Sequence, residues 1–267
     1  MSALRDIYLT SIRVSWLSQL QYRVGLAIWI VGLAIEPVVY LVVWTTVADA
    51  QGGSVGGFTR GAFAAYYIVW IVVRVMNIAL TPWAFEERVQ RGALSPMLLR
   101  PIHPFHVDLA DFIAMKLVSL LILVPVIGVL VVLFDPSFQG GALDVALFAV
   151  ATWTGFLMRF ILVWALGLVT FWIVRIGAIF DLYFAVELLL SGRIVPIDLL
   201  PPWARTAAAL LPFRWSFGFP IELALGRLDG VDAAIGFGMQ AFWAAVGTGA
   251  LVLLWRRGVR RYSAVGA

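Results

Sequence analysis

The sequence predicts an all-α integral membrane protein with six transmembrane helices in a single domain over residues 1–267. First, 63% of the residues are hydrophobic and 13% are charged, with a mean hydropathy of +0.98. Soluble domains are about half apolar and about a quarter charged, so lipid must be the solvent for most of this surface. Second, six segments approach the length needed to cross a ~30 Å hydrocarbon layer. Third, these segments lack the two-residue alternation of membrane barrel strands.

The six predicted spans share long apolar runs with few charges, and they cover residues 24–47, 62–83, 109–134, 143–174, 176–190 and 233–255. Residues 117–134 and 233–255 contain no charge at all. The fourth span is long enough to tilt or to extend beyond the bilayer. The fifth span is shorter than a full crossing of the hydrocarbon layer requires.

The distribution of Lys and Arg predicts the orientation. With the N-terminus inside the cell, twelve of the 19 basic residues face the cytoplasm and five face outward, while Arg74 and Arg159 lie in the membrane. The cytoplasmic set is Arg5, Arg13, Arg23, Arg88, Arg91, Arg100, Lys116, Arg175, Arg256, Arg257, Arg260 and Arg261, and the outer set is Arg60, Arg193, Arg205, Arg214 and Arg227. We expect a multi-pass protein of the cell membrane with both termini in the cytoplasm.

Residues 1–23 predict an amphipathic helix that lies along the membrane surface before the first span. Apolar side chains recur there at every fourth position, at Leu4, Tyr8, Ile12, Trp16 and Leu20. That spacing places them on one helical face, as in helices that lie in the interface. Arginines spread along the segment argue against a cleavable signal peptide. A plain cytosolic tail is the alternative.

The cytoplasmic segment 84–101, between spans two and three, begins with charges. Glu86 and Glu87 precede Arg88 and Arg91, an order that suits a short helix with acids in its first turn. Gly92 is placed to end this helix, and the prolines that follow make the rest rigid. The segment is either a solvated turn or a docking element through which a cytoplasmic partner moves the two spans.

The segment 192–231 is too apolar for an ordinary loop and too rich in proline for a span. Its prolines predict two short helices, at about 202–211 and 215–225, which form a re-entrant pair on the outer side. The pair is either an outer gate or a structural cap. The candidate gate residues are Pro196, Pro201, Trp203 and Pro212.

Four charges lie deep within the predicted spans, Glu36, Arg74, Arg159 and Glu187, and Asp181 lies nearer the cytoplasmic boundary. A charge at a helix centre costs roughly 2.5–3.5 kcal/mol on insertion scales, so such groups face the bundle interior and pair with one another. Equal numbers of each sign favour ion pairs between Glu36 or Glu187 and Arg74 or Arg159. Contact with a transported substrate is the alternative.

Catalytic and metal motifs are not found in the sequence. The stretch that contains His103, His106 and Asp108 offers metal-ligating side chains, but Pro104 argues against a regular helical pair of ligands. A phosphate-binding GxxxxGK[ST] loop is missing, so this chain is not itself the ATPase of any ATP-driven system. We expect no catalytic residue, no metal site and no cofactor in this chain. The basic C-terminal stretch anchors the inner face rather than binding nucleic acid.

Three features together resemble the permease subunits of type-2 ATP-binding-cassette exporters. The first is the surface helix before span one. The second is the order Glu86-Glu87-Arg88, Gly92, Leu94 and Leu98-Leu99-Arg100-Pro101, which is similar to the coupling helix and following turn of that family. The third is the stretch 191–213, with its Ser-Gly-Arg-Ile-Val-Pro start and Leu-Pro-Pro-Trp centre, which is similar to the outer re-entrant segment. The second motif looks most like a bacterial branch linked with drug or viologen export.

The resemblance implies two permeases, identical or paired with a sister subunit, on two separate ATPase subunits that bind ATP and magnesium. Glu86, Glu87, Arg88, Arg91 and Gly92 would then form the ATPase interface. Substrate, an amphiphile such as a drug, lipid or glycolipid, would pass between the permeases along spans one, two and five by alternating access.

Two other classes stay open. A secondary carrier or channel would use the four intramembrane charges for ion coupling, and it would show an internal repeat, which we do not find. A membrane enzyme would use the region 103–111 and would need a metal or a nucleophile near the inner face.

Overall fold

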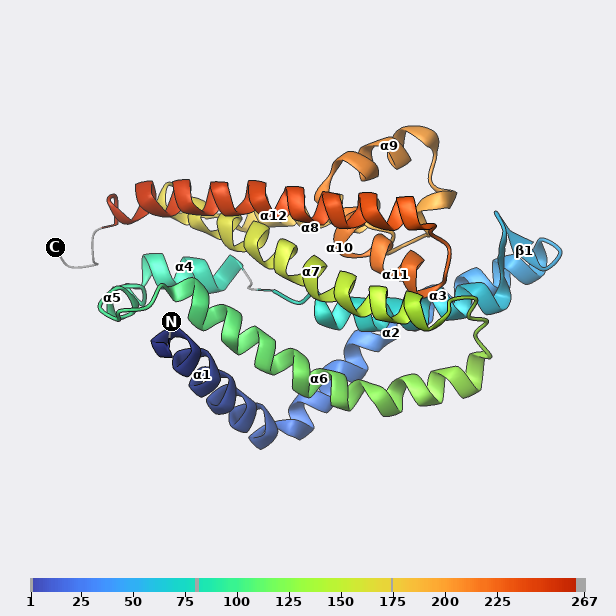
Figure 1. Ribbon diagram of the computed structural model, residues 1–267, viewed down its shortest axis with the longest axis horizontal. Coiled ribbons are helices and arrows are strands. Elements are labelled where there is room, and N and C mark those ends of the chain that lie inside the picture. The colour runs from blue at the N-terminus through green and yellow to red at the C-terminus, as the bar shows by residue number, and fades with distance from the viewer. Residues whose placement is uncertain (1, 80–81, 174, 263–267) are drawn as a thin grey trace.

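The computed structural model describes residues 2–79, 82–173 and 175–262, and helices dominate it (Figure 1). The longer helices are α1 (Ser2–Gln21), α2 (Arg23–Ala50), α3 (Arg60–Met76), α4 (Pro82–Gln90), α6 (Pro104–Phe134), α7 (Ala142–Gly167), α8 (Gly177–Leu190), α9 (Pro202–Leu210) and α12 (Gly230–Val259). The short elements are α5 (Ser95–Leu98), α10 (Pro212–Ser216), α11 (Gly218–Ala224), the 3-10 turns η1 (Leu168–Phe171) and η2 (Ile197–Leu199), and the paired strands β1 (Ser54–Val55) and β2 (Phe58–Thr59).

Within the described residues, four helical stretches are long and apolar enough to cross a membrane: α2, α6, α7 with η1, and α12. The predicted spans at 62–83 and 176–190 correspond to shorter helices, because α3 has 17 residues and α8 has 14. The helix of the second predicted span ends at Met76, and α4 begins at Pro82, a residue favoured at the first position of a helix. In the described residues the fourth predicted span leaves α-helical geometry after Gly167 and tightens into η1.

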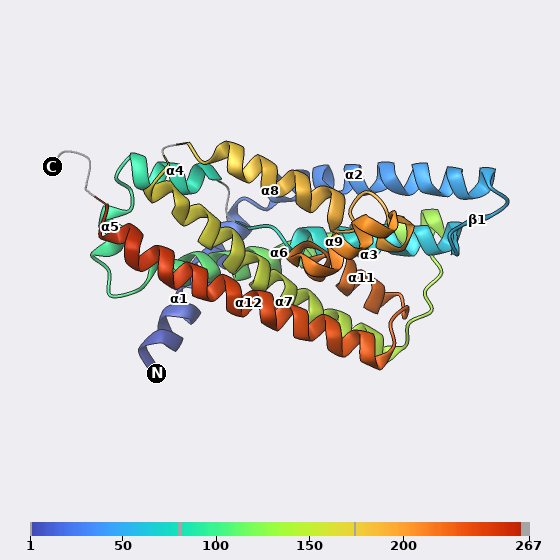
Figure 2. The same cartoon turned by 90° about the horizontal axis from the view of Figure 1, so that it is seen from above.

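The helices form one elongated bundle whose two ends differ. In Figure 1, α4, α5 and the C-terminal end of α12 lie at one end, which we call the α4 end. The hairpin β1–β2 and the connection from α6 to α7 lie at the other, which we call the hairpin end. Figure 2 shows α8 and α2 along one side of the bundle, with α12 and α7 along the opposite side. The coupling-like segment, at the α4 end, and the proline-rich segment are therefore separated along the length of the bundle (Figure 1).

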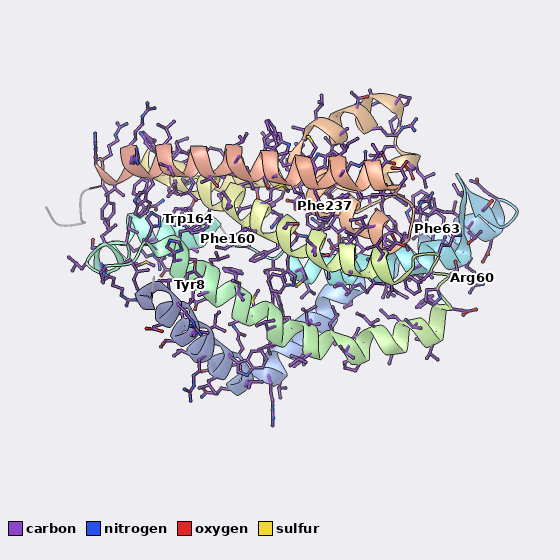
Figure 3. All side chains as sticks on the ribbon, viewed as in Figure 1. Tyr8, Arg60, Phe63, Phe160, Trp164 and Phe237 are labelled. Carbon is purple, nitrogen blue, oxygen red and sulfur yellow. The ribbon has the colours of Figure 1, made fainter. Side chains whose placement is uncertain are left out.

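α3 is the central helix, and nearly every side chain from Phe63 to Ile71 is buried. An apolar surface on all sides is what a helix in the middle of a bundle requires. Aromatic rings fill the space toward the hairpin end, where Phe63 stacks on Trp44 at 5.4 Å and on Phe58 at 5.1 Å between centroids (Figure 3). A second aromatic cluster, which includes Phe160 and Trp164, lies toward the α4 end.

The predicted N-terminal helix forms as α1 and packs on α6. The Tyr8 hydroxyl and His106 Nδ1 are 2.7 Å apart, and Tyr8, Ile12 and Trp16 of the predicted apolar face are half-buried. Apolar residues are not confined to that face, because Leu9 and Val14 are well exposed. Both surfaces of α1 are thus suited to apolar contact.

The proline-rich segment contains η2 and three short helices, α9 to α11, where the sequence predicted two. The second predicted helix is divided because Phe217 leaves helical geometry, at φ −121° and ψ −69°, between α10 and α11. The preceding loop is held by side-chain donors from α2 and α3, and Trp44 of α2 donates through Nε1 to the Ile194 carbonyl at 3.0 Å. Tyr66 Oη donates to the Gly192 carbonyl at 2.7 Å, and Tyr67 Oη donates to the Ile194 carbonyl at 2.7 Å.

Candidate functional site

α4 is the charged helix that the sequence singles out, and its boundaries differ slightly from the prediction. It begins at Pro82, so Glu86 and Glu87 lie in its second turn rather than its first, where the helix dipole has less influence. It ends at Gln90, and Gly92 follows with φ +74°. That left-handed conformation suits glycine, so Gly92 ends the helix as predicted.

Arg88 fixes α4 to two other helices from inside the protein. Its guanidinium donates two hydrogen bonds of 2.6 Å to the carboxylate of Asp108 in the first turns of α6. The indole Nε1 of Trp164 in α7 donates to the same carboxylate at 2.9 Å. Asp108 is buried, and three charge-assisted bonds compensate its lost hydration. Sequence reasoning missed this role for Asp108, because its partners lie 20 and 56 residues away.

Glu86 and Phe85 complete the attachment of α4. Glu86 Oε1 accepts a 2.9 Å hydrogen bond from the backbone N–H of Ile176, at the start of α8. Helix N-termini leave N–H groups without intrahelical partners, so this carboxylate satisfies one of them. Phe85 is buried and meets the Trp164 ring edge-on at 5.5 Å between centroids. α4 is therefore clamped to α6, α7 and α8.

Glu87 and Arg91 are the charges of α4 that point outward. They form an i, i+4 pair at 3.5 Å, and their side chains are 61% and 78% exposed. Together with Glu86 and Gln90 they line a shallow hollow of about 160 Å³. The predicted interface residues thus divide into an outward pair, Glu87 and Arg91, and the inward anchors Glu86 and Arg88.

The four intramembrane charges form two pairs that a fifth charge joins. Arg74 bonds Glu36, and Arg159 donates to both carboxylate oxygens of Glu187 at 2.8 and 3.0 Å. Arg193 lies between the pairs, 3.5 Å from Glu36 and 3.8 Å from Glu187. The sequence-based topology placed Arg193 in the outer loop, and in the structure it links the two pairs. We call this set of five linked side chains the charge chain. Its three arginines and two glutamates give these five side chains one excess positive charge.

The end of α3 lies beside this charge chain and is stabilised by two cations. Arg159 also donates to the Asn77 carbonyl, and Lys116 Nζ donates to the Ile78 carbonyl at 2.7 Å. Carbonyls at a helix C-terminus carry partial negative charge and lack intrahelical donors. Asn77 Nδ2 in turn donates to the Ser216 carbonyl of α10 at 2.8 Å. Lys116, which the sequence analysis assigned to the cytoplasmic side, is fully buried in the protein and does not face water.

The candidate gate residues do not share one environment. Pro196 and Pro212 are buried, whereas Pro201 is exposed and Trp203 is 73% exposed. Side chains from the same segment make polar contacts that the sequence did not indicate. Arg214 donates to Glu222 at 3.1 Å within the segment.

The two histidines have structural contacts. His103 is the N-cap of α6, and its Nδ1 accepts a hydrogen bond from the Phe105 N–H at 3.2 Å. Burial lowers the pKa of His103 below its ordinary value, and His106 nearby lowers it further. Within the described ranges, no group of three or more His, Cys, Asp or Glu side chains is placed to hold a metal ion.

These features define a helical membrane protein in which a charged surface helix is clamped to the bundle and a buried charge chain joins its centre to a proline-rich segment. The family model of the ABC-2 family transporter proteins matches residues 34–266, and the chain belongs to that family. It is a membrane permease subunit of an ABC transporter, and the family implies an ABC ATPase as its partner. No curated protein matches the chain.

Proposed function

We propose that this chain is the permease subunit of an ATP-driven exporter, which moves an amphiphile such as a drug, lipid or glycolipid out of the cytoplasm or the inner leaflet. Two permeases, identical or paired with a sister subunit, assemble with ATPase subunits that bind ATP and magnesium. In this proposal the α4 end faces the cytoplasm, and both chain termini lie on the cytoplasmic side of the cell membrane.

The division of charges on α4 is the observation that carries this proposal. Glu87 and Arg91 extend from the α4 end, while Glu86 and Arg88 bond α8 and α6. A docking helix needs both properties, because a partner must reach it and its movement must reach the spans. A solvated turn would require no buried bidentate ion pair. A force applied to α4 is passed to α6, α7 and α8 through contacts shorter than 3.0 Å.

We propose six spans, in which α3 and α8 complete the four long crossings. At 1.5 Å per residue the 14 residues of α8 rise about 21 Å, less than the ~30 Å hydrocarbon thickness. The proline-rich segment after α8 fills the remaining depth on the outer side. Its backbone is irregular, which is tolerated at that depth when the chain packs on protein, as Tyr66 and Tyr67 ensure.

The charge chain couples the two ends of the permease in this proposal. Arg159 contacts both the end of α3 and Glu187 of α8, and Arg193 extends the chain to the outer segment. A secondary carrier has less support, because the two intramembrane glutamates that could bind a coupling ion, Glu36 and Glu187, are paired with arginines.

The test reverses the outward pair, Glu87→Arg with Arg91→Glu, in the full chain purified from membranes with its ATPase partner. Docking through mismatched charges is penalised, so ATPase co-purification and substrate-stimulated hydrolysis should fall. The matched control reverses Asp49 and Arg60, an exposed pair at 3.6 Å at the hairpin end, and should leave both measurements unchanged. Normal assembly and normal hydrolysis in the first variant would refute docking through α4.

A further inference from the structure

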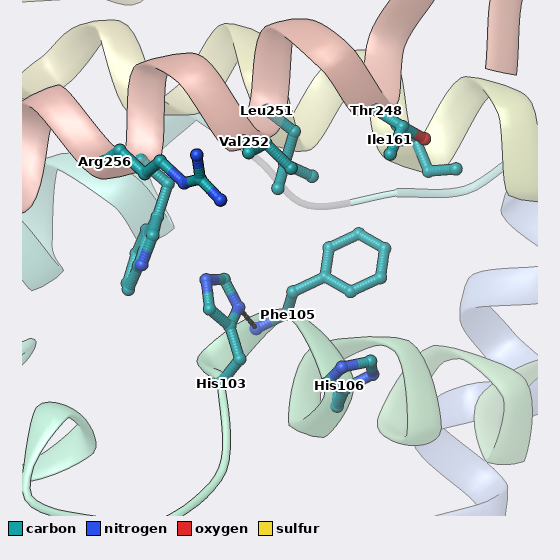
Figure 4. A pocket seen from close by; sticks show the side chains of 9 residues that line it. His103, Phe105, His106, Ile161, Thr248, Leu251, Val252 and Arg256 are labelled. Atoms are coloured by element: carbon teal, nitrogen blue, oxygen red, sulfur yellow. Dashed lines mark hydrogen bonds between the residues drawn. The ribbon is translucent and has the colours of Figure 1, made fainter. Parts of the chain in front are cut away.

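A pocket of about 360 Å³ opens at the α4 end, between the start of α6 and the facing sides of α7 and α12 (Figure 4). Its walls are mostly apolar, with Phe105 on one side and Ile161, Leu251 and Val252 on the other. It lies apart from the charge chain and from the outward face of α4. Neither the clamp nor the proposed transport path uses it.

Arg256 and His103 lie near one another at one edge of the pocket (Figure 4). Arg256, in the last turns of α12, extends its guanidinium over the pocket toward His103 (Figure 4). Among the interactions of the described residues, Arg256 has no carboxylate partner, and none of the nine lining residues there is acidic. A cation at an apolar pocket with no internal counter-ion is complementary to an external anion.

The histidines add hydrogen-bond donors beside this cation. His103 Nδ1 accepts from the Phe105 N–H, so the neutral ring carries its proton on Nε2, which is left to donate. The ring also packs against Trp255, with 4.1 Å between centroids and 56° between the ring planes, which restricts its orientation. His106 is held in place through Nδ1 by Tyr8 of α1.

The sequence beside the pocket is typical of a helix end at the membrane–water interface. Trp255 next to Arg256 and Arg257 is the arrangement typical of a helix end at the headgroup region. Basic pockets between membrane helices at this level take anionic lipid headgroups, and the apolar wall beyond suits an acyl chain. A soluble anion would leave that wall in contact with water.

We propose that this pocket binds one acidic phospholipid of the adjacent leaflet, with its phosphate on Arg256 and its acyl chain along Ile161 and Val252. The lipid joins α6 to α12 at the end of the bundle where α4 is clamped. This site is separate from the transport path, so it stands or falls independently of the export assignment.

The test is native mass spectrometry of the delipidated full chain in detergent, titrated with phosphatidylglycerol, phosphatidylcholine or glycerol 3-phosphate. One phosphatidylglycerol should bind in preference to phosphatidylcholine. Arg256→Gln should weaken that binding about fivefold, the share of one arginine at an anionic lipid surface. Arg257→Gln is the matched control, because the next residue points about 100° away around the helix and should change affinity less than twofold.

A second pair of variants tests the pocket without changing charge. Val252→Trp fills the pocket and should displace the lipid, whereas Val246→Trp, on the same helix but outside the lining, should not. Circular dichroism establishes whether each variant is folded. If Arg256→Gln does not fold, the two valine variants test the proposal by themselves. Equal binding of both lipids, equal losses in the two arginine variants, or displacement by glycerol 3-phosphate would each overturn the proposal.

Discussion

The ion pair between Arg159 and Glu187 allows a stringent test of the buried charge chain. The perturbation is Arg159→Met, which removes the guanidinium and keeps most of the volume. Arg159 is 7% exposed and Glu187 is fully buried, so water does not replace the lost partner. Among the described residues, Glu187 keeps a second basic neighbour in Arg193, whose Nη1 is 3.8 Å away.

The magnitude follows from these contacts. Leaving one member of a buried pair unpaired costs about 3–5 kcal/mol of unfolding free energy. Arg193 retains part of the attraction, which places the ion-pair loss near the lower value. The Asn77 carbonyl loses a donor as well, which costs about 1 kcal/mol more. We therefore expect Arg159→Met to lower the free energy of unfolding by about 4 kcal/mol.

The assay is a denaturing-detergent titration in mild micelles, followed by circular dichroism, for the wild type, both single variants and the double variant. Glu187→Leu added to Arg159→Met removes the stranded charge and should restore about half of the loss. Arg60→Met, which breaks an exposed pair, should change stability by less than about 1 kcal/mol. Wild-type stability of Arg159→Met, or simple additivity in the double variant, would refute the argument.

The remaining predictions concern α4, the orientation and pH. In Gly167→Ala the new Cβ would lie 2.3 Å from the ring of Phe85, so the ring or α4 must move, and we expect about 1–3 kcal/mol less stability and weaker coupling to ATP hydrolysis. The chain has no cysteine, so Ser54→Cys should react with an impermeant thiol reagent on intact cells and Gln90→Cys should not. Because burial lowers the pKa of His103 from 6.5, the unfolded form takes up the proton first, and thermal stability should decline as the pH falls below about 6.5.

Each of these predictions has a control. Gly249→Ala, where a new Cβ meets no atom within 4 Å, should leave stability and coupling nearly unchanged. Labelling at Gln90 but not at Ser54 would reverse the proposed orientation. His103→Asn keeps an N-cap acceptor without a titrating ring, so it should flatten the decline in acid. An unchanged acid decline in that variant would assign it to another group.

Local sequence patterns predicted most of the helices, because length and hydropathy are properties of contiguous residues. The spans at 24–47, 109–134 and 233–255 lie within α2, α6 and α12, and Gly92 ends α4 as expected. The division of 62–83 at Asn77 was not predicted. Its cause is a set of contacts with α6, α7 and α10, which lie far along the chain.

The sequence by itself determined that this is an integral membrane protein, since no soluble fold could bury so much apolar surface. The order of its motifs also indicated its family. Only the tertiary structure decided what each charge does. It turned Arg88 inward to Asp108, left Arg91 in solvent, and buried Lys116 against the end of α3. The physical reason is that a charge in a low-dielectric interior is stabilised by partners brought close by packing, and local periodicity carries no information about them.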